Sequence, residues 1–250
     1  NNMGTTKIEW TDRTWNPIIG CQKVSPGCEH CYAERMAGRL AAMGTEGYGE
    51  VVYRDGRWNN KTVFVEGVLE APLHWRKPCR IFVGSMGDLF HGAVEYEWLD
   101  QVFAVMAMCP QHTFQVLTKR PDVMRYYLTG RDFCDPINRL RKGNYQLAGE
   151  FVWPLLNVWL GVTAENQRMA DSRIHELLNT PAVKRFVSIE PMLSEVNLTR
   201  LNNVGTVASD VLSGYRVNLR TGFYIRGDNP DRRLDWVICG GESGPGARPM

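Results

Sequence analysis

The chain has 250 residues, of which 44% are apolar and 22% are charged, a balance typical of globular proteins. Its formal net charge of +2 argues against a strongly basic coat for nucleic acid, although it leaves room for a local basic groove. No apolar run reaches the ~18 residues of a membrane span, and the N-terminus has no signal-peptide core. We therefore expect a cytoplasmic protein with no membrane association.

Six β-strands, most of them separated by helices, are predicted along the chain. The strands are expected at 15–21, 81–83, 113–118, 157–163, 183–189 and 235–239. Helices are expected at 31–44, 95–109, 121–128 and 169–180, on the strength of apolar residues at helical spacing and of the turn signals around them. Two irregular segments, about 129–153 and 198–233, are interpreted as insertions, the second with a hairpin over 213–227.

This alternation predicts one α/β domain over residues 1–250, built on a parallel sheet. Parallel strands need long connections, which are usually helical. Five of the six predicted strands are apolar along most of their length, as expected when both faces of the sheet are covered. A parallel barrel and an open doubly wound sheet both satisfy the pattern. Both collect ligand-binding residues at the carboxyl ends of their strands.

Polar or glycine-rich turns follow all six predicted strands, so their side chains are expected to converge. They are Cys21, Ser85, Gly87, Asp88, Lys119, Arg120, Thr163, Glu165, Asn166, Ser188, Glu190, Glu242 and Ser243. Some of these residue types have simpler explanations, because Asp is common in turns and because Thr and Asn often cap helices. A basic pair in a loop is often solvated surface.

Three of the seven cysteines, Cys21, Cys28 and Cys31, fall within eleven residues, and the other four are scattered. A secreted disulfide framework is therefore not expected. A structural zinc site would need a fourth ligand, such as His30, because closed zinc sites usually have four protein ligands. Three unrelated loop thiols are a further alternative. The hypothesis we favour is a [4Fe-4S] cluster with three protein thiolates and one iron left open for a ligand.

The loop carrying these cysteines, GCQKVSPGCEHCYAE, resembles the cluster loop of radical S-adenosylmethionine enzymes. The resemblance is to a phage- and bacteria-borne family related to spore photoproduct lyase, and it covers nearly the whole chain except the two insertions. Further motifs that carry it are FVGSMGDLFH, VLTKRP, NVWLGVTAENQ, FVSIEPML and DWVICGGESGPGARPM. The cysteine spacing here is C-x6-C-x2-C, whereas C-x3-C-x2-C is the common spacing in the superfamily.

The resemblance implies a partial parallel (β/α)6 TIM-like barrel that binds a [4Fe-4S] cluster and S-adenosylmethionine. Reductive cleavage would give methionine and a 5′-deoxyadenosyl radical, with electrons from a donor such as flavodoxin or ferredoxin. The substrate class it suggests is a nucleobase, a nucleotide, DNA or RNA, in repair or modification. It also implies that the chain is incomplete at its C-terminus, because members continue with at least one more helix and strand. The rival hypothesis is a non-enzymatic, zinc-stabilised α/β binding module.

The resemblance also assigns roles to the strand-end residues. The cysteines would bind the cluster, and those assigned to the cofactor are Ser85, Gly87, Asp88, Thr163, Glu165, Asn166 and Ser188. We expect Glu190 and Glu242 to be catalytic or to line the pocket, and Lys119, Arg120 and Ser243 to meet the substrate. Trp10 and Trp15 flank the cysteine loop and are expected to pack over it.

Overall fold

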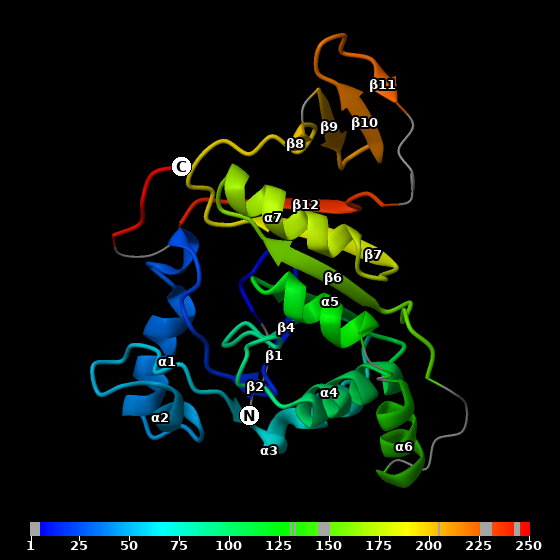
Figure 1. Ribbon diagram of the computed structural model, residues 1–250. Coiled ribbons are helices and arrows are strands. Elements are labelled where there is room, and N and C mark those ends of the chain that lie inside the picture. Colours follow the sequence, from blue (N-terminus) through cyan, green and yellow to red (C-terminus); the bar gives the residue numbers. More distant parts are fainter. Residues whose placement is uncertain are drawn as a thin grey trace.

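The architecture is an α/β fold around a six-stranded parallel sheet (Figure 1). The computed structural model describes residues 6–130, 132, 134–144, 151–204, 206–225, 232–242 and 246–250. The strands of the main sheet are β1 (Arg13–Trp15), β4 (Arg80–Val83), β5 (Thr113–Thr118), β6 (Val158–Thr163), β7 (Lys184–Ile189) and β12 (Trp236–Cys239). The predicted parallel sheet and its number of strands are thereby confirmed.

Strand order in the main sheet follows chain order, β1-β4-β5-β6-β7-β12, with no reversal. A doubly wound sheet reverses its order at a switch point, so this alternative does not apply. Right-handed connections in one direction place the helices on one face of a sheet. Figure 1 shows α4 (Tyr96–Met108), α5 (Pro121–Thr129) and α7 (Gln167–Leu178) together in front of the strands. Among the described strands β1 and β12 do not pair, so the sheet is not closed into a barrel.

The helix-covered face of the sheet contains the main hydrophobic core. Alternate strand residues such as Ile81, Val116, Leu160 and Val187 point to this face and are fully buried. The strands are continuous apolar runs because residues of the opposite face, such as Phe82 and Phe186, are buried as well. Trp15 belongs to this core and donates from Nε1 to the Val68 carbonyl at 2.9 Å. The prediction that Trp15 packs over the cysteine loop is therefore wrong.

The opposite face is concave and lined by aromatic rings. Trp10 contacts both Phe82 of β4 and Trp236 of β12, at centroid distances of 4.8 and 6.2 Å. In a flat sheet these two strands, four places apart, would lie about 19 Å from each other. The two rings are instead no more than about 11 Å apart, since both contact Trp10. The sheet is therefore strongly curved, with the helices on its convex side.

The first predicted strand, 15–21, is wrong in its position. The sheet strand is β1, whereas β2 (Ile18–Ile19) pairs with β3 (Val63–Phe64) in a separate two-stranded sheet. Pro17 lies between them, and its missing N–H and fixed φ interrupt the ladder. Asn16 instead accepts hydrogen bonds from Ser85 and from the Met86 amide at the end of β4.

The two predicted insertions are structured where they are described. The first contains α6 (Cys134–Asn144), which packs on α4 through the buried Ile137. The second forms a four-stranded antiparallel sheet, and the hairpin predicted inside it is confirmed. Its strands are β8 (Leu201–Val204), β9 (Val207–Asp210), β10 (Tyr215–Asn218) and β11 (Tyr224–Ile225). The remaining elements are α1 (Tyr32–Ala42), α2 (Tyr48–Val51), α3 (Glu66–Leu69) and the 3-10 turns η1 (Pro26–Cys28) and η2 (Ala71–His74).

Across the described ranges, none of the helices combines the length and the apolar character needed to cross a bilayer.

Gly161 provides a test of the curved sheet. A Cβ at this position of β6 would overlap the ring of Phe186 on β7, which is almost completely buried. We predict that Gly161→Ala lowers the free energy of unfolding by about 1–3 kcal/mol through overpacking. Urea unfolding measures this loss. Gly49→Ala, in the helix α2 with open space around it, is the control and should leave stability unchanged or slightly increased; equal stability of the two variants would contradict the packing.

Candidate functional site

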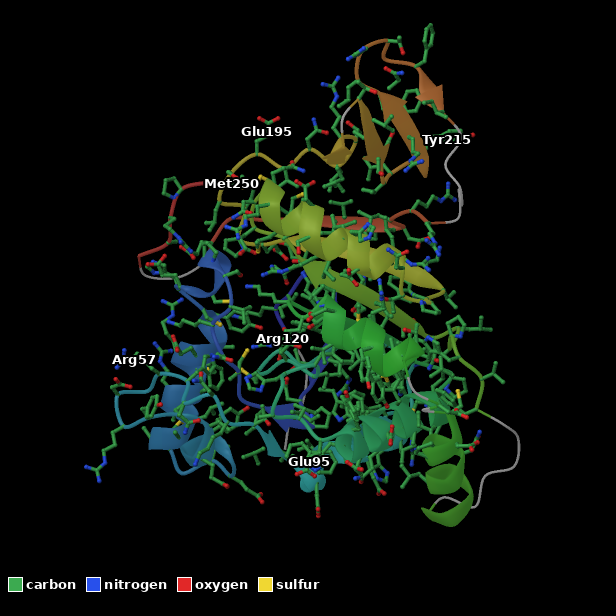
Figure 2. The ribbon with its side chains drawn as sticks, viewed as in Figure 1. Arg57, Glu95, Arg120, Glu195, Tyr215 and Met250 are labelled. Atoms are coloured by element: carbon green, nitrogen blue, oxygen red, sulfur yellow. The ribbon has the colours of Figure 1, made fainter. Side chains whose placement is uncertain are left out.

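A cavity of about 520 Å³ lies at the carboxyl ends of the parallel strands. It brings together most of the predicted site residues: Cys21, Cys28, Cys31, Ser85, Gly87, Asp88, Lys119, Arg120, Thr163, Ser188, Glu190 and Glu242. Figure 2 shows Arg120 near the middle of the molecule, between α1 and α5. Trp10 and Phe82 line the inner part of the cavity. Ser243 lies outside the described residues.

A contact between two glycines sets the start of the cysteine loop. Gly20 follows β2 and forms a parallel bridge with Gly87, which follows β4. A Cβ on Gly87 would come within 2.9 Å of the Ile18 carbonyl oxygen and 3.0 Å of that of Gly20. Gly20 has φ +95°, a conformation that residues with a side chain rarely adopt. These two glycines therefore place Cys21 directly beside the loop that ends in Asp88.

A buried carboxylate fixes the middle of the cysteine loop. Glu165 is fully buried, accepts from the Gly27 amide at 3.2 Å and pairs with Arg173 at 2.9 Å. A Cβ on Gly27 would come within 3.0 Å of the Glu165 carboxyl carbon, so only glycine fits without displacement. Burial opposes ionisation of Glu165, but hydrogen bonding by Ser25 and the charge of Arg173 outweigh it and lower its pKa. Glu165 supports the loop from behind and does not line the cavity.

The cysteine thiols face cations that project from the end of β5. Lys119 Nζ lies 3.4 Å from Cys28 Sγ, and Arg120 Nη1 lies 3.9 Å from Cys21 Sγ. Burial, followed by the nearby Asp88 carboxylate, raises the pKa of Cys21 to about 12. Burial also disfavours the Cys28 thiolate, but the Lys119 charge and nearby amides lower the net pKa. Cys31 begins α1 as its N-cap residue.

Asp88 is already saturated with hydrogen bonds. Its carboxylate accepts from Thr118 Oγ1 at 2.7 Å, from the amides of Phe90 and Lys119, and from Arg120 at 2.8 Å. The side chain is buried, and the Arg120 pair is only 11% and 6% exposed. Asp88 therefore holds the basic pair at the cavity wall. This arrangement leaves little acceptor capacity for a ligand ammonium group.

Glu190 provides an acceptor on the opposite wall of the cavity. Ser188 Oγ donates to Glu190 Oε2 at 3.1 Å. A Cβ on Gly240 would lie 2.5 Å from Glu190 Oε1, so the carboxylate occupies the space that a side chain would take. Thr163 lines the cavity nearby, and its carbonyl accepts from Arg173 at 2.7 Å. Asn166 is the N-cap of α7, accepting from the Met169 amide at 3.0 Å, and does not line the cavity.

Arg248 joins the C-terminal segment to the cysteine loop. It pairs with Glu242 at 2.6 Å and with Glu29 at 2.8 Å, and donates to the Pro26 carbonyl at 3.0 Å. Hydrogen bonding from Arg248 holds the pKa of Glu242 well below its usual range. The Glu242 carboxylate is therefore charged down to acidic pH and is engaged in a structural contact.

Several residues of the site were missed by the sequence analysis. Tyr32 donates from its hydroxyl to the Ser85 carbonyl at 2.9 Å and lines the cavity, while Arg173 and Arg248 support the cysteine loop. Tyr32 adjoins Cys31 in sequence, so its place next to the cysteine loop was a usable signal. The two arginines are far away in sequence, and only the fold brings them to the loop.

The thiols do not form a metal site as they stand. Within the described ranges, no group of three or more His, Cys, Asp or Glu side chains has an arrangement that could hold a metal ion. All seven cysteines are free thiols.

Comparison with known proteins gives a family. The chain belongs to the family described as "Protein of unknown function (DUF5131)", whose model matches residues 5–250. No curated protein and no solved structure matches the chain.

Glu165→Gln tests the support of the cysteine loop. The substitution preserves size but leaves the Arg173 cation buried without its partner, so we predict a loss of about 3–5 kcal/mol in the free energy of unfolding. The native pKa of Glu165 is lowered, so its stabilisation is complete above the unfolded-state pKa and is lost as pH falls through the folded-state pKa. The difference in the free energy of unfolding between wild type and Glu165→Gln should therefore become smaller as the pH falls. Urea unfolding between pH 7 and 3 measures it.

Asp55→Asn is the matched control, since Asp55 forms an exposed pair with Arg57. Asp55→Asn should lower the free energy of unfolding by no more than about 1 kcal/mol. A loss for Glu165→Gln as small as that of the control would contradict the role of the buried pair.

Proposed function

We propose that the chain is a radical S-adenosylmethionine enzyme whose [4Fe-4S] cluster is bound by Cys21, Cys28 and Cys31. The single observation that carries the proposal is that these three thiols, from one loop, line one cavity together with polar residues from the ends of the parallel strands. A site with three thiolates leaves one cluster iron open, and an open metal position is what a catalytic centre requires.

The donor set and the size of the cavity fit this group. About 520 Å³ is within the range of small-molecule and cofactor sites. The cations Lys119 and Arg120 lie beside two of the thiols, where they would compensate the negative charge of thiolates. For the cluster to bind, Cys21 and Cys28 would have to give up their contacts with Arg120 and Lys119. Cys21 would also have to lose its proton, which its raised pKa disfavours.

The proposal extends to the fold. A sheet with sequential strand order, strong curvature and helices on its convex side is what an opened (β/α)6 barrel requires. The cavity then corresponds to the carboxyl-end mouth at which such barrels build their sites. We propose that residues 1–250 act as a single barrel domain of this kind.

When bound, the cluster would supply the electron that cleaves S-adenosylmethionine to methionine and a 5′-deoxyadenosyl radical. Ser85, Gly87, Thr163 and Ser188 line the cavity, and we propose that they would contact this cofactor. Glu165, Asn166 and Asp88 would act indirectly, by positioning the loop, the helix and the basic pair.

For the substrate we propose a nucleobase or nucleotide, in DNA or RNA. Lys119 and Arg120 offer positive charge for a phosphate, and Glu190 offers an acceptor for a base N–H or a sugar hydroxyl. Glu242 forms an ion pair with Arg248, so we propose that it helps to shape the pocket and does not transfer a proton. The physiological electron donor would be a small redox protein such as flavodoxin or ferredoxin. Free thiols and a reductively activated cluster suit a reducing compartment such as the cytoplasm.

Anaerobic reconstitution with iron and sulfide tests the proposal. We predict about four irons and four sulfides per chain, and formation of 5′-deoxyadenosine when S-adenosylmethionine and dithionite are added, measured by mass spectrometry. Cys21→Ala, Cys28→Ala and Cys31→Ala should each abolish nucleoside formation and reduce iron content. Cys79→Ala and Cys239→Ala alter thiols that do not line the cavity, so these variants should retain both the iron content and the formation of 5′-deoxyadenosine.

One zinc per chain with no iron uptake would contradict the enzyme and favour the zinc-stabilised binding module. A cluster that forms without any cleavage of S-adenosylmethionine would contradict the proposed reaction.

A further inference from the structure

The second insertion concentrates positive charge in a nearly neutral chain. Residues 198–233 contain six Arg and three Asp, with no Lys or Glu, so the segment has a formal charge of +3. The whole chain has only +2, so the remainder is slightly negative. A basic segment on such a background attracts polyanions locally.

Arginines from this segment line a surface groove at the amino ends of β7 and β12. A cavity of about 460 Å³ there is bordered by Arg185, Arg232 and Arg233. Among the described residues, none of these three forms an ion pair: Arg185 donates to the Thr180 carbonyl, and Arg232 donates to Asn179 at 2.7 Å. Among the described residues that border this part of the groove and its continuation, Asp235 is engaged by Lys184 and by the Arg185 amide, and Asp210 accepts from the Leu212 and Ser213 amides.

The groove continues towards the antiparallel sheet. A second cavity, of about 190 Å³, shares Leu178, Asn179 and Arg232 with the first and extends to Tyr215 and Arg216. Burial is the main cause that lowers the pKa of Arg185; the Asp235 carboxylate opposes this shift, and the smaller effect of the Arg232 charge adds to it. Arg185 and Arg232 therefore lie close enough to repel each other, while Asp235 acts in the opposite direction.

Aromatic rings are exposed on the sheet beside the groove. Phe223 is 74% exposed and Tyr224 is 61% exposed, and Tyr215 forms an edge-on contact with Tyr224 at 6.2 Å. Figure 2 shows Tyr215 on this sheet, which Figure 1 shows projecting beyond β12 and α7. Exposed rings next to arginines are the combination by which proteins bind unpaired bases and their phosphates.

We infer that this groove and the aromatic edge of the antiparallel sheet bind a single strand of nucleic acid. The arginines would contact phosphates, and Tyr215 and Tyr224 would stack on bases, which a duplex does not offer. The inference deepens the proposed function, because it names the form in which the substrate would be presented.

The groove would anchor nucleotides that flank the reacting one. It lies at the amino ends of the strands, whereas the cysteine cavity lies at their carboxyl ends. The six residues of β7 separate the two by about 20 Å. A strand bound in the groove therefore needs several further nucleotides to reach the cavity.

Fluorescence anisotropy with a labelled 20-nucleotide single strand, in DNA and RNA form, tests the inference on the full chain. We predict that Arg232→Ala/Arg233→Ala weakens binding and reduces the slope of log affinity against log salt by about 1.4, or about 0.7 per lost phosphate contact. Tyr224→Ala should weaken binding roughly 5- to 150-fold through lost stacking. Thermal unfolding of each variant verifies that it is folded.

Two variants elsewhere on the surface serve as matched controls. Arg76→Ala/Lys77→Ala removes the same charge, and Tyr53→Ala removes a ring that is 56% exposed. Both should bind like wild type apart from a small uniform charge effect. Groove variants that bind like these controls, or a duplex that binds as tightly as the single strand, would overturn the inference. The assay needs neither cluster nor S-adenosylmethionine, so its failure is distinguishable from failure of the proposed enzyme.

Discussion

The buried carboxylate of Glu165 is the constraint on which the candidate site depends. It connects the end of β6 to the middle of a loop 138 residues earlier, through the Gly27 amide. Arg173 of α7 neutralises it and also binds the Thr163 carbonyl, so one ion pair ties strand, helix and cysteine loop together. Removing one partner of such a pair costs far more than an exposed pair does, because a buried charge is left behind. The cysteines are therefore attached to the sheet and do not belong to an independent loop.

Strand order and curvature explain why the polar residues meet. Sequential parallel strands with helices on one face leave the other face free, and the contacts of Trp10 with Phe82 and Trp236 demonstrate how far that face is curved. The carboxyl ends of β4, β5, β6 and β7 consequently surround one cavity. The same winding puts the amino ends at the opposite edge, where the arginine groove lies. The cavity that we propose for catalysis and the groove that we propose for a single strand therefore lie at opposite ends of the same strands.

Much of this arrangement could be predicted from the sequence, because apolar runs followed by polar turns identify strand ends. That rule predicts that Ser85, Asp88, Lys119 and Ser188 lie close together, and all four line one cavity. It could not distinguish Asn166, which caps α7, from a ligand-binding residue, since both roles use the same amide oxygen. Nor could it find the partnership of Glu165 with Gly27, because nothing local signals a contact across 138 residues. Of the four strands in the second insertion, the sequence predicted only one hairpin. These strands have two to four residues and few buried positions, so their apolar pattern is too short to identify them.

We propose that the three cysteines bind one iron–sulfur cluster inside the cavity that Ser188 and Glu190 also line. Anomalous diffraction at the iron absorption edge, from crystals of anaerobically reconstituted protein, tests this claim most directly. The account predicts a single compact iron peak within bonding distance of the sulfurs of Cys21, Cys28 and Cys31. An iron-free cavity, or iron bound only at other cysteines, would contradict it.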